Sequence, residues 1–172
     1  MQVSRSMTSR PHALYTPEQR RRRDETPWTQ VQGVLALVQF GVFLVSLGLI
    51  LRYMTTGTGL ALATASIIIK TLVLYTIMIT GSLWEREVFG RYLFAGPFFW
   101  EDVVSMVVIA LHTAYLAALL SNSVDVHEQL LLALAAYTAY AVNATQFVIK
   151  LRAARRETDR PPLLTAVPGE VS

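Results

Sequence analysis

The sequence predicts an all-α integral membrane protein: a bundle of four transmembrane helices, with both termini in the cytoplasm and a short surface helix before the first span. Of its 172 residues, 53% are hydrophobic and only 16% are charged, whereas a soluble domain carries about a quarter charged residues. The charges gather before residue 30, between 85 and 102, and after 149. The apolar runs between them can each cross hydrocarbon, which takes about 20 residues. Ionised groups avoid hydrocarbon because burying one there costs several kcal/mol.

Residues 1–25 form a polar N-terminal segment in which the short surface helix is expected. In Thr16-Pro17-Glu18-Gln19 the threonine can cap, the proline suits the first helical position, and the glutamine is placed for a capping box. Thr26-Pro27 is a second start signal. Trp28 would then lie at the membrane interface, which favours its amphipathic ring. The membrane domain is therefore expected over residues 26–152.

Within that domain, four spans are expected at about 31–53, 60–84, 100–120 and 126–150. A polar, glycine-containing loop separates the first two, and a stretch rich in charges and aromatic rings separates the second from the third. Asp125, three residues before Glu128, resembles a capping pair for the fourth span. Residues 153–172 contain several prolines and are expected to form a disordered tail.

Lysine and arginine predict the orientation. They gather in the N-terminal segment, in the 85–100 loop and after residue 149, while the loop at 121–129 has none. Because positive charge is retained on the cytoplasmic side, both termini and the 85–100 loop are expected there.

Several function classes are excluded. The chain has no cysteine, so disulfides, iron–sulfur clusters and thiol nucleophiles are ruled out. The net charge of +3 comes from basic residues beside the spans, where anionic headgroups attract them, and no nucleic acid is expected as a partner. The sequence contains no nucleophile elbow, phosphate loop, dinucleotide fingerprint or HExxH zinc motif.

All four spans carry a polar or aromatic-polar side chain at a similar depth. At 1.5 Å per residue from the cytoplasmic helix ends, this layer lies about 14–16 Å deep and consists of Gln39, Tyr75, His112 and Tyr140. Such groups can simply bond to one another and hold the bundle together. For His112 a functional role is favoured, because a histidine at mid-membrane is unusual and can ligate a metal.

Lys70 is a second anomaly, since it lies near the middle of the second span. An unpaired ammonium there would lose its proton or find a carboxylate, either in the bundle or on a ligand. A small transporter or proton carrier is a further reading, and it rests on this residue alone.

The third span carries a polar stripe. Glu101, Ser105 and His112 follow helical spacing along one face, which is expected to face the bundle interior. Asp102 is adjacent, and Glu85 ends the second span, so three carboxyls are expected at the cytoplasmic mouth. Close carboxylates disfavour double ionisation, which leaves one able to act as a general acid. The alternative is that the acids merely begin a helix and that Glu85 belongs to a solvated face.

Two sequence blocks carry a family resemblance. Residues 84–95 (WEREVFGRYLFA) and 98–106 (FFWEDVVSM) resemble the central block of the vinyl (bacterio)chlorophyllide hydratases, as do residues 15–18, 26–28, 70–72 and 143–147. The resemblance covers roughly residues 14–156. It implies that water adds across the C3 vinyl group of a chlorophyllide or bacteriochlorophyllide, giving a 1-hydroxyethyl group in bacteriochlorophyll synthesis. It also implies that no cofactor is needed, because the substrate carries its own magnesium.

The chemistry of this reaction and the depths of the polar residues suggest roles for the candidate residues. Proton transfer would fall to Glu101, Asp102 and Glu85, and His112 would hold the substrate magnesium. Substrate binding would fall to His112, Lys70, Tyr75, Tyr140, Ser105, Gln39 and Asn143.

The implied setting is the cytoplasmic or intracytoplasmic membrane of a phototrophic bacterium, with the pigment and the bilayer as partners. The sequence leaves open a homo-oligomer or association with other pigment-synthesis enzymes. A non-catalytic subunit that binds pigment or stabilises a photosynthetic complex is the alternative function. The carboxyl group cluster favours an enzyme.

Overall fold

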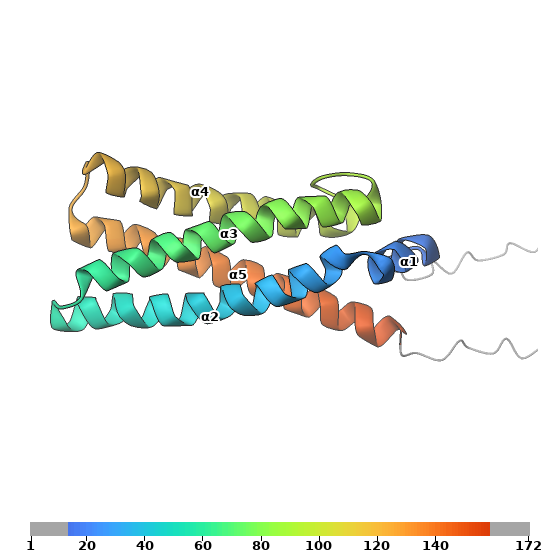
Figure 1. Ribbon diagram of the computed structural model, residues 1–172, viewed down its shortest axis with the longest axis horizontal. Helices are drawn as coiled ribbons and strands as arrows, with labels where there is room; N and C mark the ends of the chain where they lie inside the picture. The colour runs from blue at the N-terminus through green and yellow to red at the C-terminus, as the bar shows by residue number, and fades with distance from the viewer. Residues whose placement is uncertain (1–13, 159–172) are drawn as a thin grey trace, which may run out of the picture.

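The computed structural model of the protein describes residues 14–158, and this part of the chain is helical without any strand (Figure 1). Its elements are α1 (Pro17–Glu25), α2 (Pro27–Thr56), α3 (Leu60–Phe89), the short 3₁₀ turn η1 (Gly96–Phe98), α4 (Phe99–Ser121) and α5 (Val126–Thr158). The predicted all-α class and the short helix before the first span are both confirmed.

Four segments are long and apolar enough to cross a membrane: Pro27–Thr56, Leu60–Phe89, Gly96–Ser121 and Val126–Arg152. Each contains or closely matches one predicted span, and several extend further because charged residues near a span end are good helix formers. Helix α5 continues to Thr158, so it takes in residues 153–158, which the sequence prediction gave to the tail. The rest of the predicted tail and residues 1–13 lie outside the described residues.

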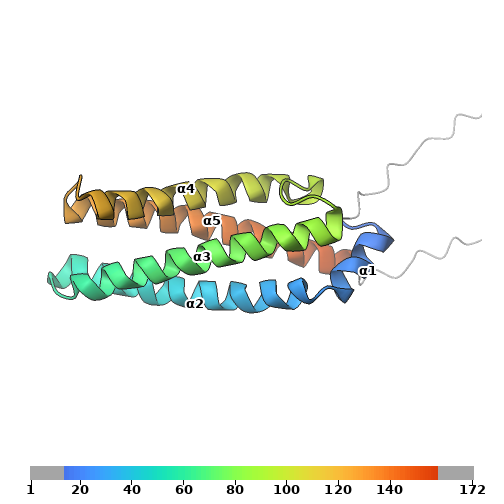
Figure 2. The same cartoon turned by 45° about the horizontal axis from the view of Figure 1, so that its top comes forward.

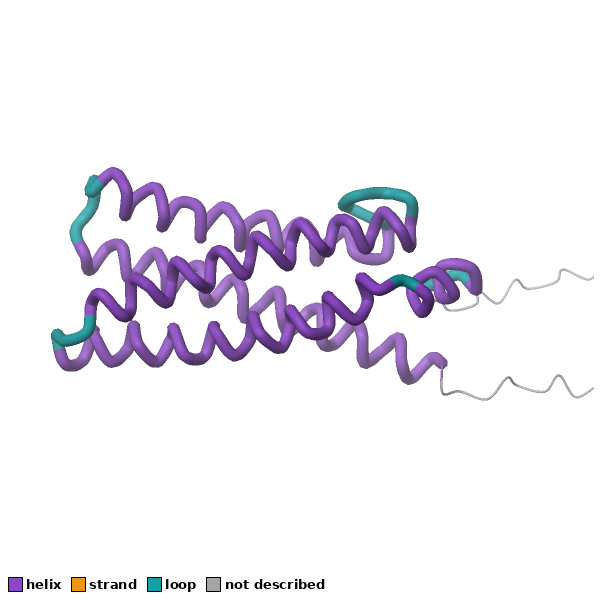
Figure 3. The backbone as a smooth tube through the Cα atoms, in the orientation of Figure 1, coloured by secondary structure: helices purple, strands orange, loops and turns teal. Residues whose placement is uncertain are grey.

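The long helices form two antiparallel hairpins, α2–α3 and α4–α5 (Figures 1 and 2). The start of α2, the α3–α4 loop and the end of α5 lie at one end of the bundle together with α1, and we call this the α1 end (Figure 3). The α2–α3 and α4–α5 loops lie at the far end. The membrane domain therefore begins and ends at the same end of the bundle.

The predicted helix starts are built as the sequence indicates. Thr16 and Gln19 form a capping box, with each side chain accepting from the other's backbone N–H. The Thr26 hydroxyl accepts from the backbone N–H of Trp28 at the start of α2. The Asp125 carboxylate accepts from the N–H of Glu128 at 2.9 Å. These caps satisfy donors that the first turn of a helix leaves free.

Packing is more extensive within each hairpin than between the two hairpins. At the α1 end a separate aromatic cluster closes the bundle, in which Tyr15 stacks on Phe89 and Phe98 lies edge-on to Trp84. Phe98 belongs to η1, so this cluster fixes the α3–α4 loop against the bundle. The loop is thereby held over the carboxyl groups described next.

Candidate active site

Two buried carboxyl groups face each other at the α1 end. Glu85 is in the last turns of α3 and Asp102 in the first turn of α4, and both are nearly inaccessible to solvent. The two carboxyls are neighbours, so the charge of one disfavours ionisation of the other. Two carboxyls that share a site do not readily ionise together, and one of them keeps its proton. The pair is therefore arranged to store a proton at the edge of an apolar bundle.

The α3–α4 loop fixes this pair. The Phe94 N–H donates to Asp102 Oδ2 at 2.7 Å, and the Ala95 N–H donates to Glu85 Oε2 at 3.2 Å. Phe94 has a φ of +59°, a left-handed conformation that a bulky residue rarely adopts. The two carboxyls and the loop therefore hold one another in place, and the loop amides leave the carboxyls little freedom to rotate.

Glu101 is a neighbour of this pair but has a different partner. Its Oε2 accepts from Lys150 Nζ on α5 at 2.6 Å, and the two side chains are 10% and 24% exposed. Lys150 Nζ also lies 5.0 Å from the centre of the Phe98 ring. This ion pair sets Glu101 apart from Glu85 and Asp102, whose carboxyls accept from the α3–α4 loop. Of the three carboxyls expected to converge, Glu85 and Asp102 lie together, and Glu101 instead forms an ion pair with Lys150.

One turn deeper, an amide joins α4 to α5. Asn143 Nδ2 donates to Ser105 Oγ at 2.8 Å, and both residues are buried. The Asn143 carbonyl oxygen and the side-chain carbonyl oxygen of Gln146 are buried and have no hydrogen-bond partner within the described residues. Ser105 and Asn143, both predicted site residues, therefore lie together.

His112 lies deeper still on α4 and is fully buried. Its Nδ1 is 2.8 Å from the carbonyl oxygen of Val108, and since a carbonyl can only accept, Nδ1 carries the proton. The lone pair of the neutral ring is then on Nε2, which has no partner among residues 14–158. The ring stacks on Tyr137 of α5 at 5.8 Å. This nitrogen is the one that could ligate a metal.

Lys70 and Gln39 share this interior layer, at 0% and 1% exposure. Lys70 Nζ lies 3.6 Å from the centre of the Tyr140 ring, a cation–π arrangement. Within the described residues it has no hydrogen-bond partner, and neither amide atom of Gln39 has one. The bundle acid considered as a partner for Lys70 is thus not found in this part of the chain, and a ligand carboxylate remains the other candidate.

Tyr75 is not part of the interior layer. It is only half-buried, and its hydroxyl bonds to Thr113 Oγ1 at 2.7 Å between α3 and α4. The interior layer instead includes Tyr137, which sequence reasoning missed although it lies three residues before Tyr140 on the same helix face. The carboxyl groups and His112 also remain separate sets, since ten residues of α4, or about 15 Å, lie between Asp102 and His112.

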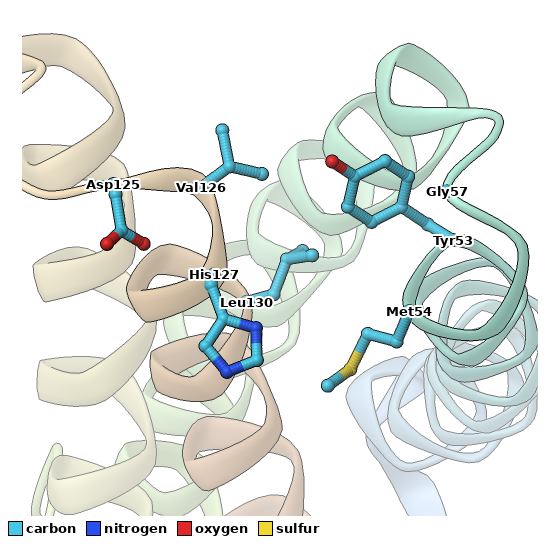
Figure 4. A pocket seen from close by; sticks show the side chains of 7 residues that line it. All are labelled: Tyr53, Met54, Gly57, Asp125, Val126, His127 and Leu130. Carbon is cyan, nitrogen blue, oxygen red and sulfur yellow. The ribbon is translucent and has the colours of Figure 1, made fainter.

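A shallow pocket of about 470 Å³ lies at the far end, between the two loops. Figure 4 shows Tyr53 and Met54 on one side and Asp125 and His127 on the other. None of the predicted site residues lines it. Among the described residues, no group of three or more His, Asp or Glu side chains is placed to hold a metal ion.

Comparison with known proteins shows the family. The model of the 2-vinyl bacteriochlorophyllide hydratase (BCHF) family matches residues 15–153. The chain belongs to this family. The 2-vinyl bacteriochlorophyllide hydratase of Cereibacter sphaeroides is 61% identical over 150 residues, which is 87% of this chain and 93% of that protein. The protein of the same name from Rhodobacter capsulatus is 61% identical over 143 residues, 83% of each chain. No solved structure has significant similarity to the chain.

The family match confirms the resemblance seen in the sequence blocks and includes the whole bundle. Both carboxyl groups of the pair, the Glu101–Lys150 ion pair, the amides of α5 and the interior layer all lie within the matched residues 15–153. The site described above is therefore part of the region that defines the family.

Proposed function

We propose that this multi-pass membrane protein is a hydro-lyase that adds water across the ring vinyl group of a bacteriochlorophyllide, giving a 1-hydroxyethyl group. Membership of a hydratase family and the names of the two relatives support the reaction. The observation that carries the chemistry is the Glu85–Asp102 pair, a proton-holding carboxyl pair at the end of an apolar bundle. The same names count against a non-catalytic pigment-binding subunit.

The reaction requires an acid, a positioned water and a dry slot. The π electrons of the vinyl group take a proton at the terminal carbon, and the positive charge that develops on the inner carbon is delocalised into the macrocycle. A water lone pair then forms the new C–O bond at that inner carbon. The oxygen finally loses a proton to a base, so that one water has been added without any change in electron count. No redox cofactor enters this balance.

The three carboxyls divide these roles according to their partners. The Glu85–Asp102 pair holds a proton and is proposed as the general acid, which is typically worth about 10²–10⁴-fold in rate. Glu101 forms an ion pair with Lys150 at 2.6 Å and is proposed as the base that takes the proton from the added water. Proton return from Glu101 to the pair then restores the site, since Glu101 and Asp102 are adjacent on α4.

The macrocycle is proposed to lie between the two hairpins, which pack less extensively against each other than within themselves. His112 Nε2 would ligate the substrate magnesium, and Lys70 would pair with the propionate. Tyr140 and Gln39 would line the slot, and Tyr75 would lie at its α3–α4 edge. Because the interior layer is buried, the hairpins must part to admit the ring. The vinyl edge would point toward the α1 end, covering part of the 15 Å along α4.

The protein is proposed to act in the cytoplasmic or intracytoplasmic membrane of a phototrophic bacterium, with both termini and the carboxyl groups on the cytoplasmic side. Positive charge at the α1 end supports this orientation. Whether it forms a homo-oligomer or associates with other pigment-synthesis enzymes is a separate question that co-purification would answer.

The test is an incubation of the purified protein with the vinyl pigment in oxygen-18 water, without nucleotide or redox cofactor. We expect a hydroxyethyl product that carries one oxygen-18 atom, identified by mass spectrometry. Pigment that binds and is recovered unhydrated would contradict the proposal and favour the non-catalytic subunit. A product that forms only when a redox cofactor is added would contradict the cofactor-free balance.

A further inference from the structure

The facing surfaces of α4 and α5 carry a ladder of polar contacts. Ser105 meets Asn143 at 2.8 Å, and two turns along α5 toward the α1 end Glu101 meets Lys150 at 2.6 Å. Gln146 lies between these contacts, three residues after Asn143 and four before Lys150, on the same helix face. The antiparallel register places Gln146 opposite the turn of α4 that contains Asp102.

Two buried side-chain carbonyl oxygens on this ladder have no hydrogen-bond partner among residues 14–158. They are Asn143 Oδ1 and Gln146 Oε1, and Asn143 is only 8% exposed. Leaving a buried acceptor unsatisfied costs about 1–3 kcal/mol, so such groups are normally matched by protein or by an ordered water. Because Asn143 Nδ2 is already committed to Ser105, the side of this amide that remains free is the carbonyl. The ladder therefore presents two acceptors one helical turn apart, beside the proton-holding pair.

A ligand that satisfies two acceptors must bring two donors. Water is the smallest molecule that does so, and once its two hydrogens are bound its lone pairs point away from the amides. We propose that Asn143 and Gln146 are positioning residues that hold the water that attacks the vinyl group. This inference rests on the proposed hydratase function and deepens it, because it states which residues bind the attacking water.

The step balances with the groups already described. The Glu85–Asp102 pair gives its proton to the terminal vinyl carbon, and the lone pair of the held water forms the C–O bond at the inner carbon. The amides only accept hydrogen bonds, so once the C–O bond has formed, one hydrogen turns from its amide to Glu101, which takes the proton. Since the inner carbon becomes a new stereocentre, the face from which the held water attacks decides which epimer forms.

The experiment measures turnover, KM and the ratio of the two hydroxyethyl epimers for wild type, Asn143→Leu and Gln146→Met. Each change removes the carbonyl at nearly constant volume, and Asn143→Leu also removes the bond to Ser105. We expect kcat to fall about tenfold for each lost hydrogen bond to the water, with KM unchanged and the epimer ratio moving toward one. Thr145→Val is the matched control, since this exposed α5 residue bonds only to the Ala141 carbonyl, and it should match wild type.

Ser105→Ala is a third variant, chosen because it keeps both amide side chains. It removes the hydroxyl that accepts from Asn143 Nδ2, so the Asn143 side chain can rotate and the epimer ratio should again move toward one. Lower turnover with an unchanged ratio in all three site variants would overturn the inference and leave the amides a structural role. If wild type itself forms no hydroxyethyl product, the proposed function fails instead, and the two failures are thereby distinguished.

Discussion

Asp102→Asn and Glu85→Gln distinguish a role of these carboxyls in proton transfer from a role in anchoring the α3–α4 loop. Both carboxyls accept from loop N–H groups, at 2.7 Å for Asp102 and 3.2 Å for Glu85. An amide keeps an acceptor oxygen for those bonds, so the loop and the strained Phe94 can stay in place. What the amide cannot do is hold and release a proton.

The expected loss of stability and the expected loss of catalytic rate differ enough to be told apart. Replacing a charged acceptor by a neutral one weakens a hydrogen bond by about 1 kcal/mol, and a loss of that size leaves a stable bundle folded. Loss of a general acid costs about 10²–10⁴-fold in rate, or roughly 3–5 kcal/mol of transition-state stabilisation at 1.36 kcal/mol per decade. We therefore expect turnover to fall at least a hundredfold, with pigment binding and thermal unfolding nearly unchanged.

The assay pairs oxygen-18 incorporation with a pigment-binding titration and a thermal melt in the same detergent. Thr145→Val, a change at an exposed α5 residue outside the carboxyl cluster, serves as a comparison for non-specific damage. Two amide variants that retain wild-type turnover would refute the reasoning and make the carboxyls loop anchors only. So would variants whose lost turnover is accompanied by an equal loss of folded protein.

Four further predictions concern the other parts of the site. His112→Ala should weaken binding of the magnesium pigment at least tenfold but leave binding of its magnesium-free form unchanged, since only Nε2 ligation is lost; equal weakening of both forms would contradict magnesium ligation. Lys70→Met should raise the free energy of unfolding by about 1–3 kcal/mol, because it removes a buried amine that has no hydrogen-bond partner within the described residues, and it should weaken binding of the free-acid pigment but not of its methyl ester; a destabilised variant would show that the contact of Lys70 with the Tyr140 ring outweighs that cost. Lys150→Met should lower the free energy of unfolding by about 1–3 kcal/mol, because it leaves Glu101 without its charge-assisted bond; an unchanged melt would show that the pair is not formed. Reporter fusions should place both termini in the cytoplasm and both far-end loops outside, and an external terminus would contradict the orientation.

The bundle could be predicted from sequence because hydrocarbon imposes a simple constraint. Uninterrupted apolar runs predict the four long helices, and capping residues such as Thr16 and Asp125 predict where helices begin, as the structure confirms. The helix ends were less predictable. Glu85 is outside the apolar run but inside α3, because leaving the hydrocarbon does not stop a helix.

The sequence predicted which residues belong to the site more fully than it predicted the contacts between them. Spacing along α4 placed Glu101, Ser105 and His112 on one buried face, and the structure agrees. Spacing cannot give the rotation of one helix against another, however. The Glu101–Lys150 pair, the stacking of Tyr137 on His112 and the outward position of Tyr75 depend on that rotation, so they required the structure.

A structure of the protein with the bound vinyl pigment tests the central claim most directly, in a Glu85→Gln variant that binds without turnover. The account predicts a macrocycle between the α2–α3 and α4–α5 hairpins, with its magnesium on His112 Nε2 and its vinyl edge toward Asp102. It also predicts an ordered water between the Asn143 and Gln146 carbonyls. A pigment on the lipid-facing surface, or one whose vinyl edge points to the far end of the bundle, would contradict it.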